Sequence, residues 1–346
     1  MGQVQEGPCQ TIQHPVSPNS GNFRAGGLTM YFVVTTIMLM EVYAIVALSL
    51  NFLLGVAGRF SAYEAAMMGI GAYTAALLAQ NLGLNLLLGS VAGALFCALI
   101  GIIFQIMTRY MDFFTFKITS FAAQMTLWQT FMTWRDVTGG ANGIYGIPRP
   151  SLFGFSFEGT FAYFWFTTAM ALVAIGSLVY LERTQFALAL RGLRDGEEAL
   201  ESLGKNTFLL KLKVFALSGA AVGFAGGLLA GLLRGVSPQS FYVYVSVIFI
   251  IFVTAGGRGN LKGTIIAVIG LTVIQEAIKM IPSLPTTWIG PLQQIFYGAV
   301  LVLIILFRPG GLLPEVPIVR KGKSAERAVA LPGFSFLSNP SERKSR

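Results

Sequence analysis

The chain has 346 residues, of which 54% are hydrophobic and 11% are charged, and its net charge is +9. Soluble domains carry about 25% charged residues, so this composition excludes an ordinary globular protein. The basic residues gather in loops and near the C-terminus instead of along an aromatic-laced face, which argues against nucleic-acid binding. With one histidine and two cysteines that form no CxxC pair, we expect neither a histidine-based metal site nor a disulfide framework.

Three regions follow from the distribution of polar residues. Residues 1–27 are polar and lack the basic start and apolar core of a signal peptide, so we expect a disordered leader. Residues 28–314 are predicted to form a transmembrane domain, and residues 315–346 a basic cytoplasmic tail. We expect this tail to be disordered, or alternatively to hold anionic lipid headgroups.

Nine hydrophobic segments lie within the transmembrane region, and several reach the about 20 residues that cross the hydrocarbon core. A glycine-rich sequence at 55–59 allows a break after the first segment. We therefore expect an all-α integral membrane protein, a polytopic bundle of about 8–10 transmembrane helices with broken or re-entrant segments. The segments are 28–54, 60–82, 84–108, 112–134, 160–181, 214–234, 241–257, 263–281 and 288–307.

The polar stretch from Arg135 to Thr160 cannot span, so it is predicted to be an external loop or a re-entrant segment. Basic residues are concentrated in the loop 182–213 and in the tail after Phe307, and both should face the cytoplasm. An even number of segments separates these two regions, so the two assignments agree. The side of the N-terminus depends on whether the first segment splits, and the sequence leaves this open.

The loop 182–213 contains the most informative stretch. Asp195 could cap a short helix with Glu198 reaching back, and Gly204 could end it. Ala199, Leu200 and Leu203 would share one face of a helix too short to be stable alone. This pattern favours either a coupling helix that inserts into a cytoplasmic ATPase or a surface helix that lies on the protein's own loops.

Small residues recur every four positions in two of the segments. They are predicted to bring helix backbones close together, as in GxxxG-type packing, and not to form a ligand site. The two ladders are Gly89, Gly93, Cys97 and Gly101, and Gly219, Gly223, Gly227 and Gly231.

Charged residues inside apolar segments are costly and should face a partner, a pore or an interface. Glu64 is the preferred pathway residue because it follows the glycine-rich break; the alternative is a carboxylate satisfied by a neighbouring helix. The residues expected along a translocation pathway are Asn51, Tyr63, Glu64, Tyr73 and Asn142.

No nucleotide-binding or catalytic motif is present in the sequence. The stretch from Ala199 to Asn206 contains Gly204-Lys205 but lacks the leading glycine and the Ser or Thr of a phosphate-binding loop. There is also no GxSxG or HExxH sequence. We therefore expect no enzymatic activity and no cofactor in this chain, and any ATP-derived energy would have to come from another chain.

Several short motifs occur in order over about residues 40 to 315. They are Leu50-Asn51-Phe52-Leu53-Leu54-Gly55, Gly69-Ile70-Gly71-Ala72-Tyr73, Thr138-Gly139-Gly140-Ala141-Asn142-Gly143, Arg194-Asp195 with Glu197, Ala199 and Gly204, Ser237-Pro238, Gly256-Gly257, and Phe307-Arg308-Pro309-Gly310-Gly311. Taken together, they resemble the permease subunits of bacterial branched-chain amino acid ABC importers. Their number and spacing carry the resemblance, because each motif alone is weak.

The resemblance implies a multi-pass protein of the bacterial inner membrane with its C-terminus in the cytoplasm. It implies ATP-binding subunits, a second permease subunit and a periplasmic substrate-binding protein as partners, for import of branched-chain or related amino acids and small amides. The ATPase-coupling residues carried over are Arg194, Asp195, Glu197, Glu198, Ala199, Leu200, Leu203 and Gly204.

The chain departs from the family where Arg59 and Glu64 stand in place of the usual Gln and His or Gln, and we expect both near the entrance of the pathway. Two alternatives remain. One is a ribose- or nucleoside-type ABC permease, and the other is a secondary transporter that works without an ATPase.

Overall fold

The computed structural model describes residues 20–152, 155–157, 159–279, 286–308 and 310–313. The basic tail 315–346 and residues 1–19 of the expected leader lie outside this range. The first helix begins at Ser20, earlier than the first apolar segment that starts at residue 28.

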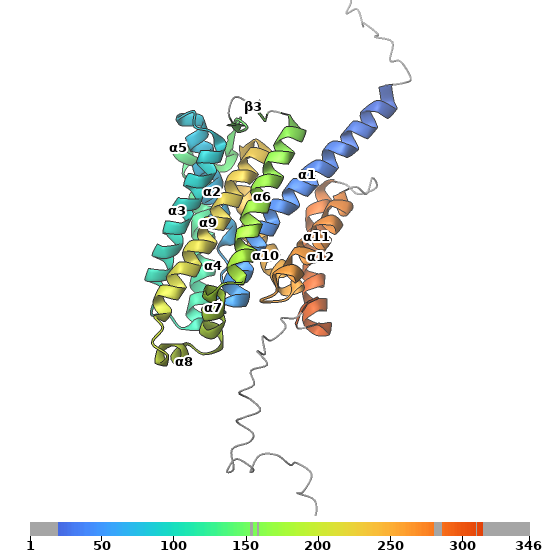
Figure 1. The fold of residues 1–346 in the computed structure, drawn as a ribbon. Coiled ribbons are helices and arrows are strands. Elements are labelled where there is room, and N and C mark those ends of the chain that lie inside the picture. Colours follow the sequence, from blue (N-terminus) through green and yellow to red (C-terminus); the bar gives the residue numbers. More distant parts are fainter. Residues whose placement is uncertain (1–19, 153–154, 158, 280–285, 309, 314–346) are drawn as a thin grey trace, which may run out of the picture. The chain divides into compact units, whose positions relative to one another are not determined.

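Each of the nine hydrophobic segments coincides with one long helix in Figure 1, which confirms the expected all-α polytopic class. Among the residues that the structure describes, seven helices are long and apolar enough to cross a membrane, whereas α2 and α4 fall outside this set. The helices are α1 (Ser20–Asn51), α2 (Glu64–Asn81), α3 (Leu86–Met107), α4 (Phe113–Thr133), α6 (Thr160–Glu182), α9 (Thr207–Leu233), α10 (Val243–Gly256), α11 (Leu261–Lys279) and α12 (Thr286–Phe307).

Short elements lie between the long helices. Turn η1 follows α1, one group follows α4, and β4 and η3 follow α9. Two small antiparallel pairs form, β1 with β4 and β2 with β3. A second group follows α6. The elements are η1 (Phe52–Val56), α5 (Arg135–Thr138), η2 (Gly140–Asn142), β1 (Ile144–Tyr145), β2 (Ser151–Leu152), β3 (Phe155–Ser156), α7 (Gln185–Asp195), α8 (Glu197–Ser202), β4 (Gly235–Val236) and η3 (Pro238–Phe241).

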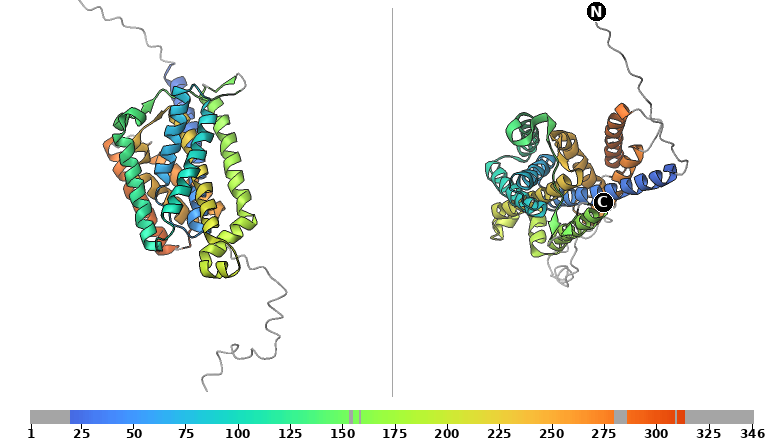
Figure 2. Two further views of the ribbon diagram at one scale, coloured as in Figure 1. Left: turned by 90° about the vertical axis from the view of Figure 1, so that its left-hand side faces the viewer. Right: turned by 90° about the horizontal axis from the view of Figure 1, so that it is seen from above.

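The first apolar segment ends in a break. Helix α1 continues into η1, a π-helical turn, and irregular backbone from residue 57 to 63 precedes α2. Side chains of α1 are buried from Val42 to Leu50 almost without interruption, because α1 packs against α6, α9, α10 and α11. Helix α12 lies at the edge of the bundle, in contact with α10 and α11 (Figure 2).

The predicted ladders of small residues pack against each other and against α2, which confirms that they serve close helix packing. A Cβ added to Gly93 would lie 2.8 Å from the Gly71 carbonyl oxygen, and one added to Gly219 would lie 2.4 Å from the Cys97 oxygen. Separations this short leave no room for a side chain. Helices α2, α3 and α9 therefore form a tightly packed layer in which backbones touch.

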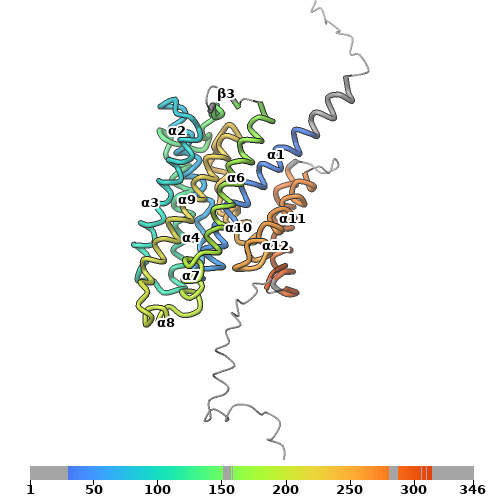
Figure 3. The backbone as a smooth tube through the Cα atoms, viewed as in Figure 1, coloured from blue at the N-terminus to red at the C-terminus, as the bar shows by residue number. Residues whose placement is uncertain are grey.

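The two ends of the bundle carry different connections. At one end, the Gly146 N–H donates to the Arg234 oxygen and the Gln80 amide donates to the Tyr145 oxygen. At the other end lie α7 and α8, together with the residues after α12, whose Leu312 N–H donates to Ala255 at the end of α10 (Figure 3). The basic loop and the end of α12 thus share one side, as the even number of segments requires.

The close approach of α2 to α9 gives a prediction about stability. Replacing Gly71 by Ala should destabilise the fold by about 1–3 kcal/mol or more, because the new Cβ would lie 2.2 Å from the Gly223 carbonyl oxygen. The matched control is Gly176→Ala on α6, where no atom lies within 4 Å. The midpoint of thermal unfolding in detergent measures both, and equal midpoints would contradict the packing argument.

Candidate functional site: the α7–α8 loop and the break after α1

The connection between α6 and α9 is built from two short helices that meet at Gly196. Helix α7 is amphipathic and buries Ala187, Leu190 and Leu193, with which it packs onto η1, α6 and α9. Helix α8 contains no buried residue. The loop therefore consists of an anchored helix followed by an exposed one.

Part of the predicted capping of this loop is wrong. Asp195 is the last residue of α7, and the residue that caps α8 is Gly196, which has an extended backbone and no side chain to cap with. The Asp195 carboxylate instead accepts a hydrogen bond from Arg194 Nε at 3.2 Å. Gly204 lies just beyond α8 with a left-handed φ of 75°, where glycine is favoured.

The apolar side chains in and just after α8 differ in their surroundings. Leu200 points back toward Gly192 of α7, where an added Cβ would lie 3.3 Å from Leu200 Cδ1. Leu203 is 78% exposed, and Ala199 and Glu198 are exposed as well. Leu200 thus secures the loop internally, and Leu203 is available to another surface.

Arg194 joins this loop to the break after α1. Its Nη1 donates a 2.6 Å hydrogen bond to the carbonyl oxygen of Gly55 in η1. Its side chain also packs over Gly58, whose added Cβ would lie 2.6 Å from Arg194 Cγ. A carbonyl left free by the π-helical turn is thereby satisfied by a charged donor, a strong type of hydrogen bond.

A group of charged side chains secures the start of α8. Lys211 of α9 donates to the Glu197 carboxylate, and Arg59 lies 3.9 Å from the same carboxylate. Partial burial opposes ionisation of Glu197, but Lys211 and then Arg59 outweigh it and hold the pKa of this carboxyl below its ordinary value. The carboxylate therefore remains ionised at neutral pH.

Sequence reasoning misplaced Arg59 and missed Lys211. Arg59 does not lie with Glu64 at the entrance of a pathway but at the α7–α8 end, where burial lowers the pKa of its guanidinium and the charge of Glu197 partly offsets that effect. The available signal was a basic residue after the glycine-rich break and another after a loop that contains acidic residues. That signal cannot say which pairs meet, because the partners are far apart in the chain.

The side chain of Asn51 connects the break after α1 to the turn before α11 through hydrogen bonds. Its Nδ2 donates to Thr264 Oγ1 at 2.8 Å, and its Oδ1 accepts from the Gly259 N–H at 2.8 Å. The side chain is fully buried. The α10–α11 turn and the end of α1 are therefore fastened to each other by one amide.

Three further pathway candidates are buried where α2 meets its neighbours. Glu64 is 2% exposed, and Tyr63 and Tyr73 are each 4% exposed. The Tyr73 ring lies between Phe131 and Phe241, and the Tyr63 ring packs on Phe104. A solute could reach these side chains only if the surrounding helices separate.

The first turn of α2 is hydrogen-bonded to side chains of α4 and α10. The Ala65 N–H donates to Ser246 Oγ, and the Ala66 N–H donates to Gln124 Oε1. Glu64 Oε1 is buried without a hydrogen-bond partner among the residues that the structure describes. Asn142 lies apart from this group, exposed on the segment that follows α4.

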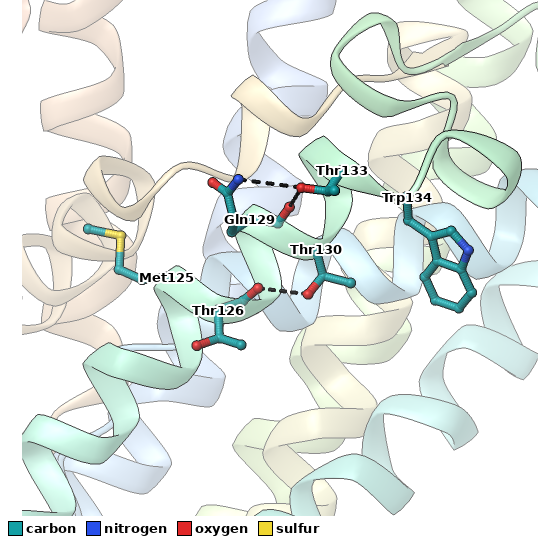
Figure 4. Close-up of a pocket in the computed structure, with 6 residues that line it drawn as sticks. All are labelled: Met125, Thr126, Gln129, Thr130, Thr133 and Trp134. Atoms are coloured by element: carbon teal, nitrogen blue, oxygen red, sulfur yellow. Dashed lines mark hydrogen bonds between the residues drawn. The ribbon is translucent and has the colours of Figure 1, made fainter.

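A groove of about 720 Å³ runs along the outer face of α4, lined mainly by apolar atoms together with several amide and hydroxyl groups (Figure 4). Gln129, Thr130 and Thr133 are exposed along it, although α4 is embedded in the bundle through Phe116, Gln124 and Phe131. Thr130 and Thr133 donate to backbone oxygens of α4 itself, so their hydroxyls can still accept hydrogen bonds. No residue predicted from the sequence lies in this groove.

This combination of a broken first helix, tightly packed membrane helices and an anchored loop defines a polytopic α-helical membrane protein. The family model described as "branched-chain amino acid transport system / permease component" matches residues 32–305. The chain belongs to this family.

The curated relatives agree. The high-affinity branched-chain amino acid transport system permease protein LivM of Escherichia coli K12 is 31% identical over 80% of this chain and 68% of its own length. LivM of Salmonella typhimurium is 30% identical over 82% and 71%. The xylose transport system permease protein XylH of Escherichia coli is 27% identical over only 39% of this chain and 35% of its own length. No solved structure matches the chain significantly.

The fastening role of Asn51 is open to test. Asn51→Ala should lower the free energy of unfolding by about 1–3 kcal/mol, because the buried Gly259 N–H loses its acceptor. Asn81→Ala, at an exposed position at the end of α2, is the matched control. Thermal unfolding of both variants in detergent is the measurement, and an unchanged midpoint for Asn51→Ala would show that the amide is dispensable.

Proposed function

We propose that this protein is the membrane-spanning permease subunit of an ATP-driven importer in a bacterial inner membrane, with its C-terminus in the cytoplasm. It works with ATP-binding subunits, a second permease subunit and a periplasmic substrate-binding protein. The cargo is a branched-chain or related amino acid or a small amide. The names of the relatives support the cargo class, and ATP is bound and hydrolysed by the partner subunits.

The single observation that carries this proposal is the construction of the α7–α8 loop. An exposed helix with Leu203 at its outer side is available to a partner, while Arg194 ties the same loop to the backbone of the break after α1. A force applied to α8 would therefore reach the point where the first membrane helix is interrupted. The coupling set is Arg194, Asp195, Glu197, Glu198, Ala199, Leu200, Leu203 and Gly204.

In this proposal, the translocation pathway runs along the groove on the outer face of α4. Exposed amide and hydroxyl groups on a membrane helix are unfavourable against lipid tails, so this face requires a polar neighbour. A second permease subunit facing the groove would enclose a polar passage between two chains. Groups that accept and donate hydrogen bonds, such as Gln129, suit the ammonium and carboxylate of an amino acid.

Glu64, with Tyr63, Tyr73 and Asn51, has a different place in the proposal. Glu64, Tyr63 and Tyr73 are buried around α2 and would face the pathway only in a conformation in which α4 and α10 move away from the first turn of α2. Asn51 would face it only if the break after α1 separates from the turn before α11. Asn142 would lie at the outer mouth.

A secondary transporter is the alternative from another class, and it predicts movement of a solute in liposomes by this chain alone. The sugar-permease alternative has less support, because the resemblance to XylH is confined to 39% of the chain.

The partner surface can be tested at Leu203. Leu203→Asp should abolish recovery of the ATP-binding subunit with the tagged chain, because a carboxylate would replace the most exposed apolar side chain beside α8. Leu82→Asp, at a 65% exposed leucine at the end of α2, is the matched control and should leave recovery unchanged. Affinity purification with mass spectrometry measures the amount of ATP-binding subunit recovered with each variant. Equal recovery with the two variants would refute docking at α8.

The groove is tested by removing single polar atoms from α4. Thr130→Val and Gln129→Ala should each reduce ATP-driven uptake several-fold while leaving the recovered ATP-binding subunit unchanged. Thr115→Val, at an exposed threonine of α4 outside the groove, should not affect uptake. Uptake of labelled amino acid into proteoliposomes containing the complete transporter is the measurement; normal uptake by both groove variants would place the pathway elsewhere.

A further inference from the structure

A basic pocket of about 440 Å³ lies beside the loop, between the break after α1, the turn from α3 to α4 and the start of α9. Four of its lining side chains are cationic and one is acidic, and Arg194 is also paired with Asp195 next to the pocket, which leaves an excess of two positive charges. The cations are Arg59, Arg109, Arg194 and Lys211, and the single acid is Glu197.

The acid in this pocket does not neutralise its cations. Glu197 is shared between Lys211 and Arg59, and Arg59 is the more distant partner at 3.9 Å. Arg109 makes no ion pair with any residue that the structure describes. Its guanidinium stacks on the rings of Phe208 and Tyr110, at 4.4 and 5.1 Å from their centroids. Two guanidinium groups therefore retain donors for an anion, in the planar geometry that binds phosphate oxygens well.

The surroundings of the pocket indicate what kind of anion it takes. Tyr110 is 88% exposed, Phe113 is 56% exposed and Phe114 is 73% exposed at the start of α4. Tyrosine is enriched where a membrane meets water, and the two phenylalanines add exposed apolar surface. An anion with an apolar tail would find charge in the pocket and an apolar surface directly beside it.

We propose that this pocket binds a phosphate ester, carried by the headgroup of an acidic phospholipid whose acyl chains lie against Phe113 and Phe114. Arg59 and Arg109 contact the phosphate, and Lys211 adds long-range attraction while it remains paired with Glu197. The site differs from the basic tail, and its binding is a property of this chain alone, independent of the proposed partners.

The test measures lipid retention by the purified full chain in an uncharged detergent. Short-chain phosphatidylglycerol, phosphatidylcholine and inorganic phosphate are added separately, and bound molecules are counted by native mass spectrometry. The wild type should retain phosphatidylglycerol in preference to phosphatidylcholine. Arg109→Gln should weaken its retention several-fold, and Arg59→Gln with Arg109→Gln about tenfold or more, as expected for lost charge-assisted hydrogen bonds.

Lys213→Gln is the matched control, since Lys213 is an exposed cation on α9 outside the pocket. It should retain the lipid as the wild type does. Arg109 is exposed and free of ion pairs, so its substitution is compatible with folding, which the unfolding midpoint verifies.

Three results would overturn the proposal. One is equal retention of phosphatidylglycerol by the double variant and the wild type, and another is equal retention of the two lipids by the wild type. The third is binding of inorganic phosphate as tight as that of the short-chain lipid and lost in the same variants, because this would make the ligand a free phosphate.

Discussion

The interruption of the first membrane helix is the constraint on which the other features of this protein depend. Backbone groups released by a break in a membrane helix must find partners, because hydrocarbon offers none. Here the break forms hydrogen bonds with residues that are distant in the sequence, through the side chain of Asn51 and through the backbone of Gly55. Asn51 bonds the turn before α11, and Arg194 of α7 bonds the Gly55 oxygen. The break thereby joins the α10–α11 turn to the α7–α8 loop.

Close packing around the break restricts how the bundle can move. Helices α2, α3 and α9 meet through glycines whose backbones leave no space for a side chain, so they are expected to move as one body. The exposed polar face of α4 and the exposed α8 lie outside this layer. In the proposed mechanism, a force on α8 displaces this layer as a unit. The displacement then changes the access of a solute to the exposed amide and hydroxyl groups of α4.

The fold could be predicted from the sequence to the level of individual helices, because apolar length and glycine spacing are local signals. All nine segments and both glycine ladders are confirmed on this basis. Side-chain partners could not be predicted. The sequence predicts that Asp195 and Glu198 cap the start of α8. In the structure α7 extends to Asp195, so the N-cap position of α8 falls on Gly196 instead.

Side-chain contacts in the candidate site could not be predicted from the sequence either. Arg59 contacts Glu197 and not the surroundings of Glu64, a contact between residues far apart in sequence that depends on the path of the chain after η1. The groove on α4 could not be predicted from the sequence, for a different reason. Its threonines and glutamine stand in an apolar segment at helical spacing, and only the packing of α4 reveals that this face is turned outward.

The central claim is that Arg194 transmits motion of the α7–α8 loop to the break after α1. The most direct test is the number of amino acid molecules imported per ATP hydrolysed, measured in proteoliposomes with the complete transporter carrying Arg194→Ala. The account predicts that the ATP-binding subunits still assemble and hydrolyse ATP, while import per ATP falls about tenfold or more because a charge-assisted hydrogen bond is lost. An import ratio equal to that of the wild type would contradict the account.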